Sequence, residues 1–130
     1  MVFSVTPIYA LAVAAIYLVL WFRVTALRAR KAVSIGDGAD PQLLLRIRQH
    51  GNCAEWSGFV LILMILAEGM GAPALSLHVV GALLVLGRMV HPIGLKIDTA
   101  SHALRYLGNG SNIAASLVAM ASLGIRLANA

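Results

Sequence analysis

The sequence predicts an all-α integral membrane protein, a four-helix up-down bundle, on the strength of its composition and its apolar runs. Hydrophobic residues make up 60% of the chain and charged residues 12%, and the mean hydropathy is +0.87. An average soluble domain has roughly 45–50% apolar and about 25% charged residues. So few polar side chains cannot cover a water-facing surface, which argues strongly against a soluble globule. The high mean hydropathy excludes a disordered chain.

The apolar runs give the number of helices. A membrane span needs about 20 mainly apolar residues, and the 130 residues suffice for one domain, residues 1–130. Spans are expected at about 7–27, 41–68, 74–95 and 111–128. The first run precedes its basic residues, unlike a cleavable signal peptide, and is therefore expected to be retained.

The links between the spans contain helix boundary signals. Gly36-Asp37-Gly38 is a turn signal, and Asp40 followed by Pro41 is a favourable N-cap and first helical residue. The third link is expected to cover residues 96–110, with Gly108-Asn109-Gly110 breaking the chain before the last span. Short links predict helices that alternate in direction.

Basic residues indicate the orientation. The chain has ten Lys and Arg against five Asp and Glu, a net charge of +5. The basic residues flank the first link and occur in the third, whereas the second link, residues 69–73, has no Lys or Arg. Both basic links are therefore expected in the cytoplasm and both termini outside.

No contiguous basic and aromatic face supports a nucleic-acid partner, and a single cysteine, Cys53, makes neither an intrachain disulfide nor a metal cluster.

A polar stripe enters the membrane on the second span. Arg48, Asn52 and Glu55 have the spacing i, i+4, i+7, so they lie within an arc of roughly 60° over roughly 10 Å of helix. Arg88 and His91 are neighbours on one face of the third span, at a similar depth. We expect the two groups to face one polar cavity; alternatively, Glu55 and Arg88 form a structural ion pair.

The residue types in this cluster suit a small zwitterion. Arginine binds carboxylates through two parallel hydrogen bonds, and a glutamate can hold an ammonium group. Arginine near a thiol also favours the thiolate. Such a site could bind a peptide thiol and present its thiolate to an apolar electrophile dissolved in the bilayer.

The stripe, within Ile47-Arg-Gln-His-Gly-Asn-Cys-Ala-Glu-Trp56, resembles the second-helix motif of the membrane-associated proteins in eicosanoid and glutathione metabolism, the MAPEG superfamily. This superfamily includes microsomal glutathione transferases, leukotriene C synthase and microsomal prostaglandin E synthase. Leu27-Arg-Ala-Arg-Lys31, the Gly36–Gly38 loop, the His50–Asn52 step and Gly87-Arg-Met-Val-His91 are similar to the small bacterial branch. The resemblance covers nearly the whole chain.

The resemblance implies a homotrimer in the bacterial inner membrane, with glutathione as cosubstrate bound between subunits on the cytoplasmic side. The implied glutathione-binding residues are Arg48, Asn52, Glu55, Arg88, His91 and either Arg28 or Arg30. Arg105 is the best match for the arginine that activates the thiol. Leu95 stands where some members have a tyrosine, and Gly51 where one synthase has a further arginine. On residue chemistry alone, Arg28 and Arg30 are interfacial or topology-setting residues.

We therefore expect a glutathione transferase or peroxidase that acts on lipophilic small-molecule electrophiles by thiolate attack. The first alternative is a non-catalytic bundle, or a family member that binds glutathione without turnover. The second is a small four-span multidrug exporter, which would need an acid in its first helix. Residues 7–27 contain no acid, which disfavours the exporter.

Overall fold

The computed structural model describes residues 3–130 and consists of four long helices. They are α1 (Thr6–Lys31), α2 (Pro41–Gly69), α3 (Ala74–Gly94) and α4 (Ala103–Ala128). All four are long and apolar enough to cross a membrane, and no strand occurs in residues 3–130. The all-α four-helix prediction is confirmed; of the expected single domain, residues 1 and 2 lie outside the described part.

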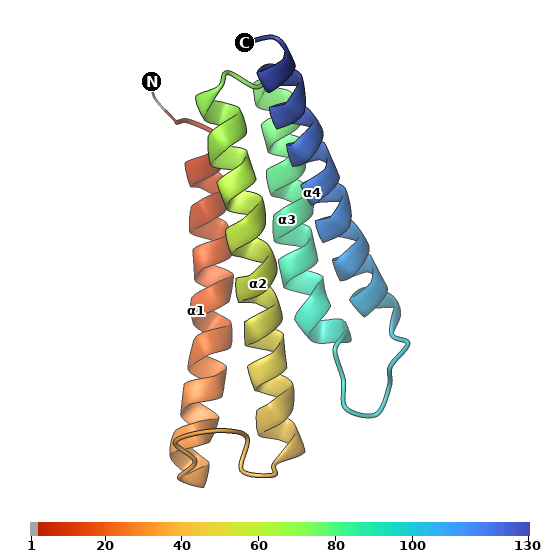
Figure 1. Ribbon diagram of the computed structural model, residues 1–130. Coiled ribbons are helices and arrows are strands. Elements are labelled where there is room, and N and C mark those ends of the chain that lie inside the picture. The colour runs from red at the N-terminus through yellow and green to blue at the C-terminus, as the bar shows by residue number, and fades with distance from the viewer. Residues whose placement is uncertain (1–2) are drawn as a thin grey trace.

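The helices alternate in direction (Figure 1). Both termini and the short α2–α3 turn lie at one end of the bundle, and the α1–α2 and α3–α4 links lie at the other. The contact between α3 and α4 is the most extensive, and α1 packs against α2 and α3. The two links that carry the basic residues therefore share one end, as the charge pattern requires if both are to lie on one side of a membrane.

The core is narrow because most large apolar side chains point outward. One buried cluster runs through the middle of the bundle and takes side chains from all four helices: Val13, Val60, Met64, Val80, Leu84, Ala115 and Ala119. By contrast, Leu11 is 74% exposed and Phe22 and Leu117 are each 61% exposed. Lipid tails are as apolar as these side chains, so a bilayer removes the cost of that exposure.

The start of α2 follows the sequence prediction. The Asp40 carboxylate accepts hydrogen bonds from the backbone N–H of Gln42 (2.8 Å) and Leu43 (3.0 Å), and Pro41 occupies the first helical turn. Asp40 also pairs with Lys31 at the end of α1. The hydrogen bond from Lys31, and after it the one from Leu43, lowers the pKa of Asp40. This cap therefore also fixes the end of α1 beside the start of α2.

The start of α4 differs from the prediction. The helix begins at Ala103, where the His102 ring accepts a hydrogen bond from the Leu104 N–H at 3.2 Å, and it continues through the three residues expected to break it. The predicted break at Gly108–Gly110 is therefore wrong. Gly108 serves helix packing instead, because a Cβ at this position would lie 2.6 Å from the Cβ of His91 on α3.

Glu68, for which the sequence suggested no role, joins α2 to the N-terminus of α1. Its carboxylate accepts hydrogen bonds from the backbone N–H groups of Ser4 (2.6 Å), Val5 (2.8 Å) and Thr6 (2.8 Å). These are donors that an isolated helix leaves without partners. A negative charge at a helix N-terminus is also favoured by the helix dipole. Glu68 thus acts as an N-cap supplied from another helix.

The two glycines in α4 should respond oppositely to alanine. Gly108→Ala should destabilise the protein by about 1–3 kcal/mol, because overpacking at His91 forces the helices apart. A methyl group at Gly110 would point into open space, with no neighbouring atom within 4 Å, so Gly110→Ala should stabilise α4 by about 0.5–1 kcal/mol. Thermal unfolding in detergent measures both, and equal effects of the two substitutions would contradict a continuous helix packed through Gly108.

Replacing Glu68 should weaken the attachment of α1. Glu68→Gln should lower stability by about 1 kcal/mol, as for loss of a helix cap, and should increase hydrogen exchange at residues 4–6. Glu55→Gln is the matched control, because Glu55 is exposed. Unchanged exchange at residues 4–6 in Glu68→Gln would show that the cap contributes nothing.

Candidate functional site

A buried arginine connects three helices. Arg88 of α3 is 1% exposed. Its Nη1 donates to the backbone carbonyl (2.9 Å) and the side-chain oxygen (3.0 Å) of Asn52 on α2. Its Nε donates to the side-chain oxygen of Asn112 on α4 at 3.2 Å. A buried charge is costly in a membrane unless it is hydrogen-bonded or paired, so these bonds fix the relative positions of α2, α3 and α4.

Asn112, which the sequence pattern did not indicate as a site residue, completes this network. It is fully buried, and its Nδ2 donates to the Gly108 carbonyl at 2.6 Å. A Cβ at Gly87 would lie 2.5 Å from the same nitrogen, so the glycine makes room for the amide. The available signal was an asparagine within an apolar run, four residues after a glycine.

The polar stripe of α2 splits between the interior and the surface. Asn52 is half-buried and contacts Arg88, whereas Arg48 and Glu55 are exposed. In residues 3–130 the structure records one ion pair, between Lys31 and Asp40. The alternative ion pair between Glu55 and Arg88 is therefore wrong for the described chain. The stripe and the Arg88 pair do not face one cavity either, because Arg48, Arg88 and Glu55 line three separate hollows.

Helix geometry explains this split. At about 100° per residue, the buried residues Gln49 and Cys53 define the inner face of α2. Asn52 lies at the edge of the stripe nearest that face, and Glu55 lies at the opposite edge. The spacing therefore predicts a common stripe correctly, but only one edge of the stripe reaches the bundle interior.

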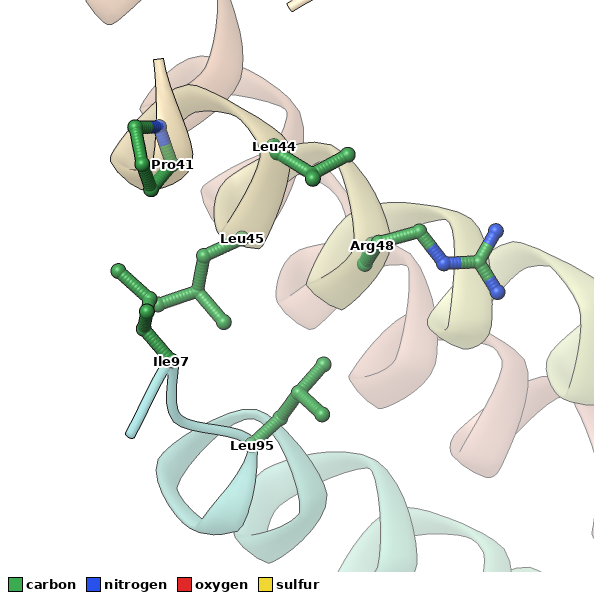
Figure 2. A pocket seen from close by; sticks show the side chains of 6 residues that line it. All are labelled: Pro41, Leu44, Leu45, Arg48, Leu95 and Ile97. Atoms are coloured by element: carbon green, nitrogen blue, oxygen red, sulfur yellow. The ribbon is translucent and has the colours of Figure 1, made fainter. Parts of the chain in front are cut away.

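Two open hollows lie along the exposed edge. Glu55, Trp56 and Phe59 line one of about 330 Å³. Arg48 lines another of about 250 Å³, whose other lining residues are Pro41, Leu44, Leu45, Leu95 and Ile97. In Figure 2 the Arg48 guanidinium points away from Ile97 along α2. The stripe thus offers a cation beside an apolar hollow and, seven residues further along, an anion beside two aromatic rings.

The end of α3 contributes Leu95 to the hollow beside Arg48, and His91 is buried in the last turn of this helix. His91 is 2% exposed and its Nδ1 has no hydrogen-bond partner within the described chain. One turn further, Gln49 Nε2 donates to the carbonyls of Pro92 (2.7 Å) and Leu95 (3.3 Å). These bonds hold the end of α3 against α2, and Leu95 lies in the wall of the hollow beside Arg48.

The remaining predicted site residues lie near the links. Arg105 is half-buried, and its Nη1 donates to the Ala100 carbonyl at 3.0 Å. Arg28 Nη1 donates to the Ser34 carbonyl at 3.3 Å, and Arg30 is exposed. The structure does not place these three in the Arg88 network. Within residues 3–130 no group of three or more His, Cys, Asp or Glu side chains could hold a metal ion.

Removing the amide of Asn112 should destabilise the bundle. Asn112→Leu leaves the buried Nε of Arg88 unpaired, which should cost about 1–3 kcal/mol. Ser116→Ala is the control, because the Ser116 hydroxyl donates only to the Asn112 backbone carbonyl, at 2.8 Å, within its own helix. Chemical denaturation in detergent compares them, and an Asn112→Leu variant as stable as Ser116→Ala would contradict the role of Asn112.

Comparison with known proteins agrees with this architecture. The model of the MAPEG family matches residues 6–125. The inner membrane protein YecN of Escherichia coli, in strain K12 and in strain O6:H1 CFT073, is 34% identical over 90 residues, 69% of each chain. No solved structure matches the chain. The inner-membrane location expected from the sequence agrees with the location in the relatives' name. With the family model covering nearly all of α1 to α4, this chain belongs to the MAPEG family.

Proposed function

We propose that this protein is a glutathione transferase or peroxidase that binds glutathione along the exposed edge of α2 and attacks lipophilic electrophiles with its thiolate. The single observation that carries this proposal is the arrangement of Arg48, Asn52 and Glu55 on one face of α2, with both charged residues exposed. Membership of the MAPEG family, which includes glutathione transferases, supports it.

The spacing of the two charges fits an extended tripeptide. Seven residues of helix separate Arg48 and Glu55 by about 10 Å, and three extended residues span at most about 10–11 Å. Glutathione has an ammonium and a carboxylate at one end and a second carboxylate at the other. Glu55 would hold the ammonium, and Arg48 would bind a carboxylate through two hydrogen bonds.

Asn52 between them is oriented by the bundle. Its side-chain oxygen accepts from Arg88, which leaves its NH₂ group as the donor for a ligand on the outer side. Arg88 would therefore act through Asn52, since its own side chain is buried. His91 would act through its packing against Gly108, which sets the distance between α3 and α4.

One chain supplies only one wall of this site. The hollows beside Arg48 and Glu55 are open, so a second copy would be needed to enclose the ligand and exclude water. A homotrimer would provide that copy at each of its interfaces. Arg28 or Arg30 would then come from the end of α1, and Arg105, as the stabiliser of the thiolate, from the start of α4. The apolar lining beside Arg48 would receive the lipophilic substrate.

Titration of the purified protein with glutathione, followed by thiolate absorbance, tests this proposal. The wild type should bind, and Glu55→Gln should bind about tenfold or more weakly, because a charge-assisted hydrogen bond is worth about 1.5–3 kcal/mol. Asp98→Asn is the control for loss of an acid, since Asp98 is an exposed acid in the α3–α4 link and outside the α2 stripe. Mass analysis of the intact oligomer tests the trimer.

The outcomes separate the candidate functions. Conjugation of a chlorodinitrobenzene, or reduction of a lipid hydroperoxide, supports the enzyme. Glutathione binding without turnover of either substrate favours the alternative, a family member that only binds glutathione. Absence of glutathione binding to the wild type, or equal binding by Glu55→Gln and wild type, overturns the proposed site.

A further inference from the structure

Apart from the two hollows along α2, a groove lies between α1 and α3, and none of its lining residues belongs to the α2 stripe. Its volume is about 330 Å³, and it is open to the outside. The walls are mostly apolar, with Ala15 and Val19 from α1 and Met89 and Ile93 from α3. Two arginines, Arg23 and Arg88, also line it. An apolar groove with two cations is unusual on a surface that faces lipid.

The positive charge at this groove is not neutralised within the described chain. Arg88 is 1% exposed and its Nη2 has no hydrogen-bond partner. Its partners are the oxygens of the neutral residues Asn52 and Asn112. Arg23 is exposed. With no carboxylate paired to either arginine in residues 3–130, the groove attracts an anion.

The level of Arg23 along α1 indicates which kind of anion would fit the groove. Arg23 lies about 26 Å along α1 from Thr6, close to the full thickness of about 30 Å of the hydrocarbon region. Arg46 of α2, whose Nη1 donates to the Arg23 carbonyl at 2.9 Å, lies at the same level. The groove therefore runs from the hydrocarbon region up to a pair of arginines at headgroup depth.

We propose that the α1–α3 groove binds an anionic phospholipid of the surrounding leaflet. The phosphate contacts Arg23, and an acyl chain lies along Ala15, Val19 and Ile93 toward the bundle centre. Basic pockets between transmembrane helices at this depth are suited to anionic headgroups. A zwitterionic lipid would fill the groove equally well but would leave the excess positive charge without a net counter-charge.

Native mass spectrometry of the protein from nanodiscs that contain equal phosphatidylglycerol and phosphatidylcholine tests this site. The wild type should retain phosphatidylglycerol preferentially. Arg23→Gln should reduce that preference roughly fivefold, the effect of one arginine near a membrane surface. Lys96→Gln is the charge-matched control, because Lys96 is an exposed cation on the α3–α4 link, away from the groove.

A second pair of variants tests the apolar part. Ala15→Phe should fill the groove and lower phosphatidylglycerol retention, whereas Ala14→Phe, on an exposed neighbour that does not line it, should not. Equal losses in Arg23→Gln and Lys96→Gln, or unchanged retention in Ala15→Phe, overturn the proposal. A disulfide-linked dimer formed by Ala15→Cys would also overturn it, because a second copy would then cover the groove. These measurements do not depend on glutathione binding.

Discussion

The arrangement of the bundle depends on one buried cation. Arg88 is held by Asn52 of α2 and Asn112 of α4, and an arginine without such partners would be costly inside a membrane. The apolar packing around it is not specific by itself, since side chains gain little by exchanging lipid for protein contacts. The directional bonds of Arg88 therefore set which faces of α2, α3 and α4 meet, and the glycines beside them allow the close approach.

This constraint also determines what α2 presents to its surroundings. With Asn52 turned inward to Arg88, the neighbouring turns carry Arg48 and Glu55 on the outside. The same hydrogen bond that stabilises the bundle thus determines which edge of α2 faces outward. Because the backbone of this edge is already helical, a ligand or a second chain that binds to it would mainly immobilise the side chains of Arg48 and Glu55.

Much of this could be predicted from the sequence, because membrane helices are specified by local composition. The four helices, the Asp40 cap and the common stripe of Arg48, Asn52 and Glu55 follow from apolar length and helical period. The rotation of α2 about its own axis does not follow from apolar length or helical period. The sequence could therefore not show that Glu55 points away from Arg88. The prediction for Gly108 was wrong for a similar reason. A glycine that breaks the chain before a helix and a glycine against which a neighbouring helix packs look alike in the sequence, and only the position of His91 on α3 distinguishes them. Asn112 was missed because its partner lies 24 residues away.

The contact made by Glu68 has a consequence for sequence variation at the start of the chain. The carboxylate binds backbone N–H groups at positions 4, 5 and 6, so the identity of those side chains contributes little to it. Relatives can therefore differ at these positions and keep the same attachment of α1 to α2. Proline is the exception, because it has no N–H to donate, and each proline introduced there would remove one of the three bonds.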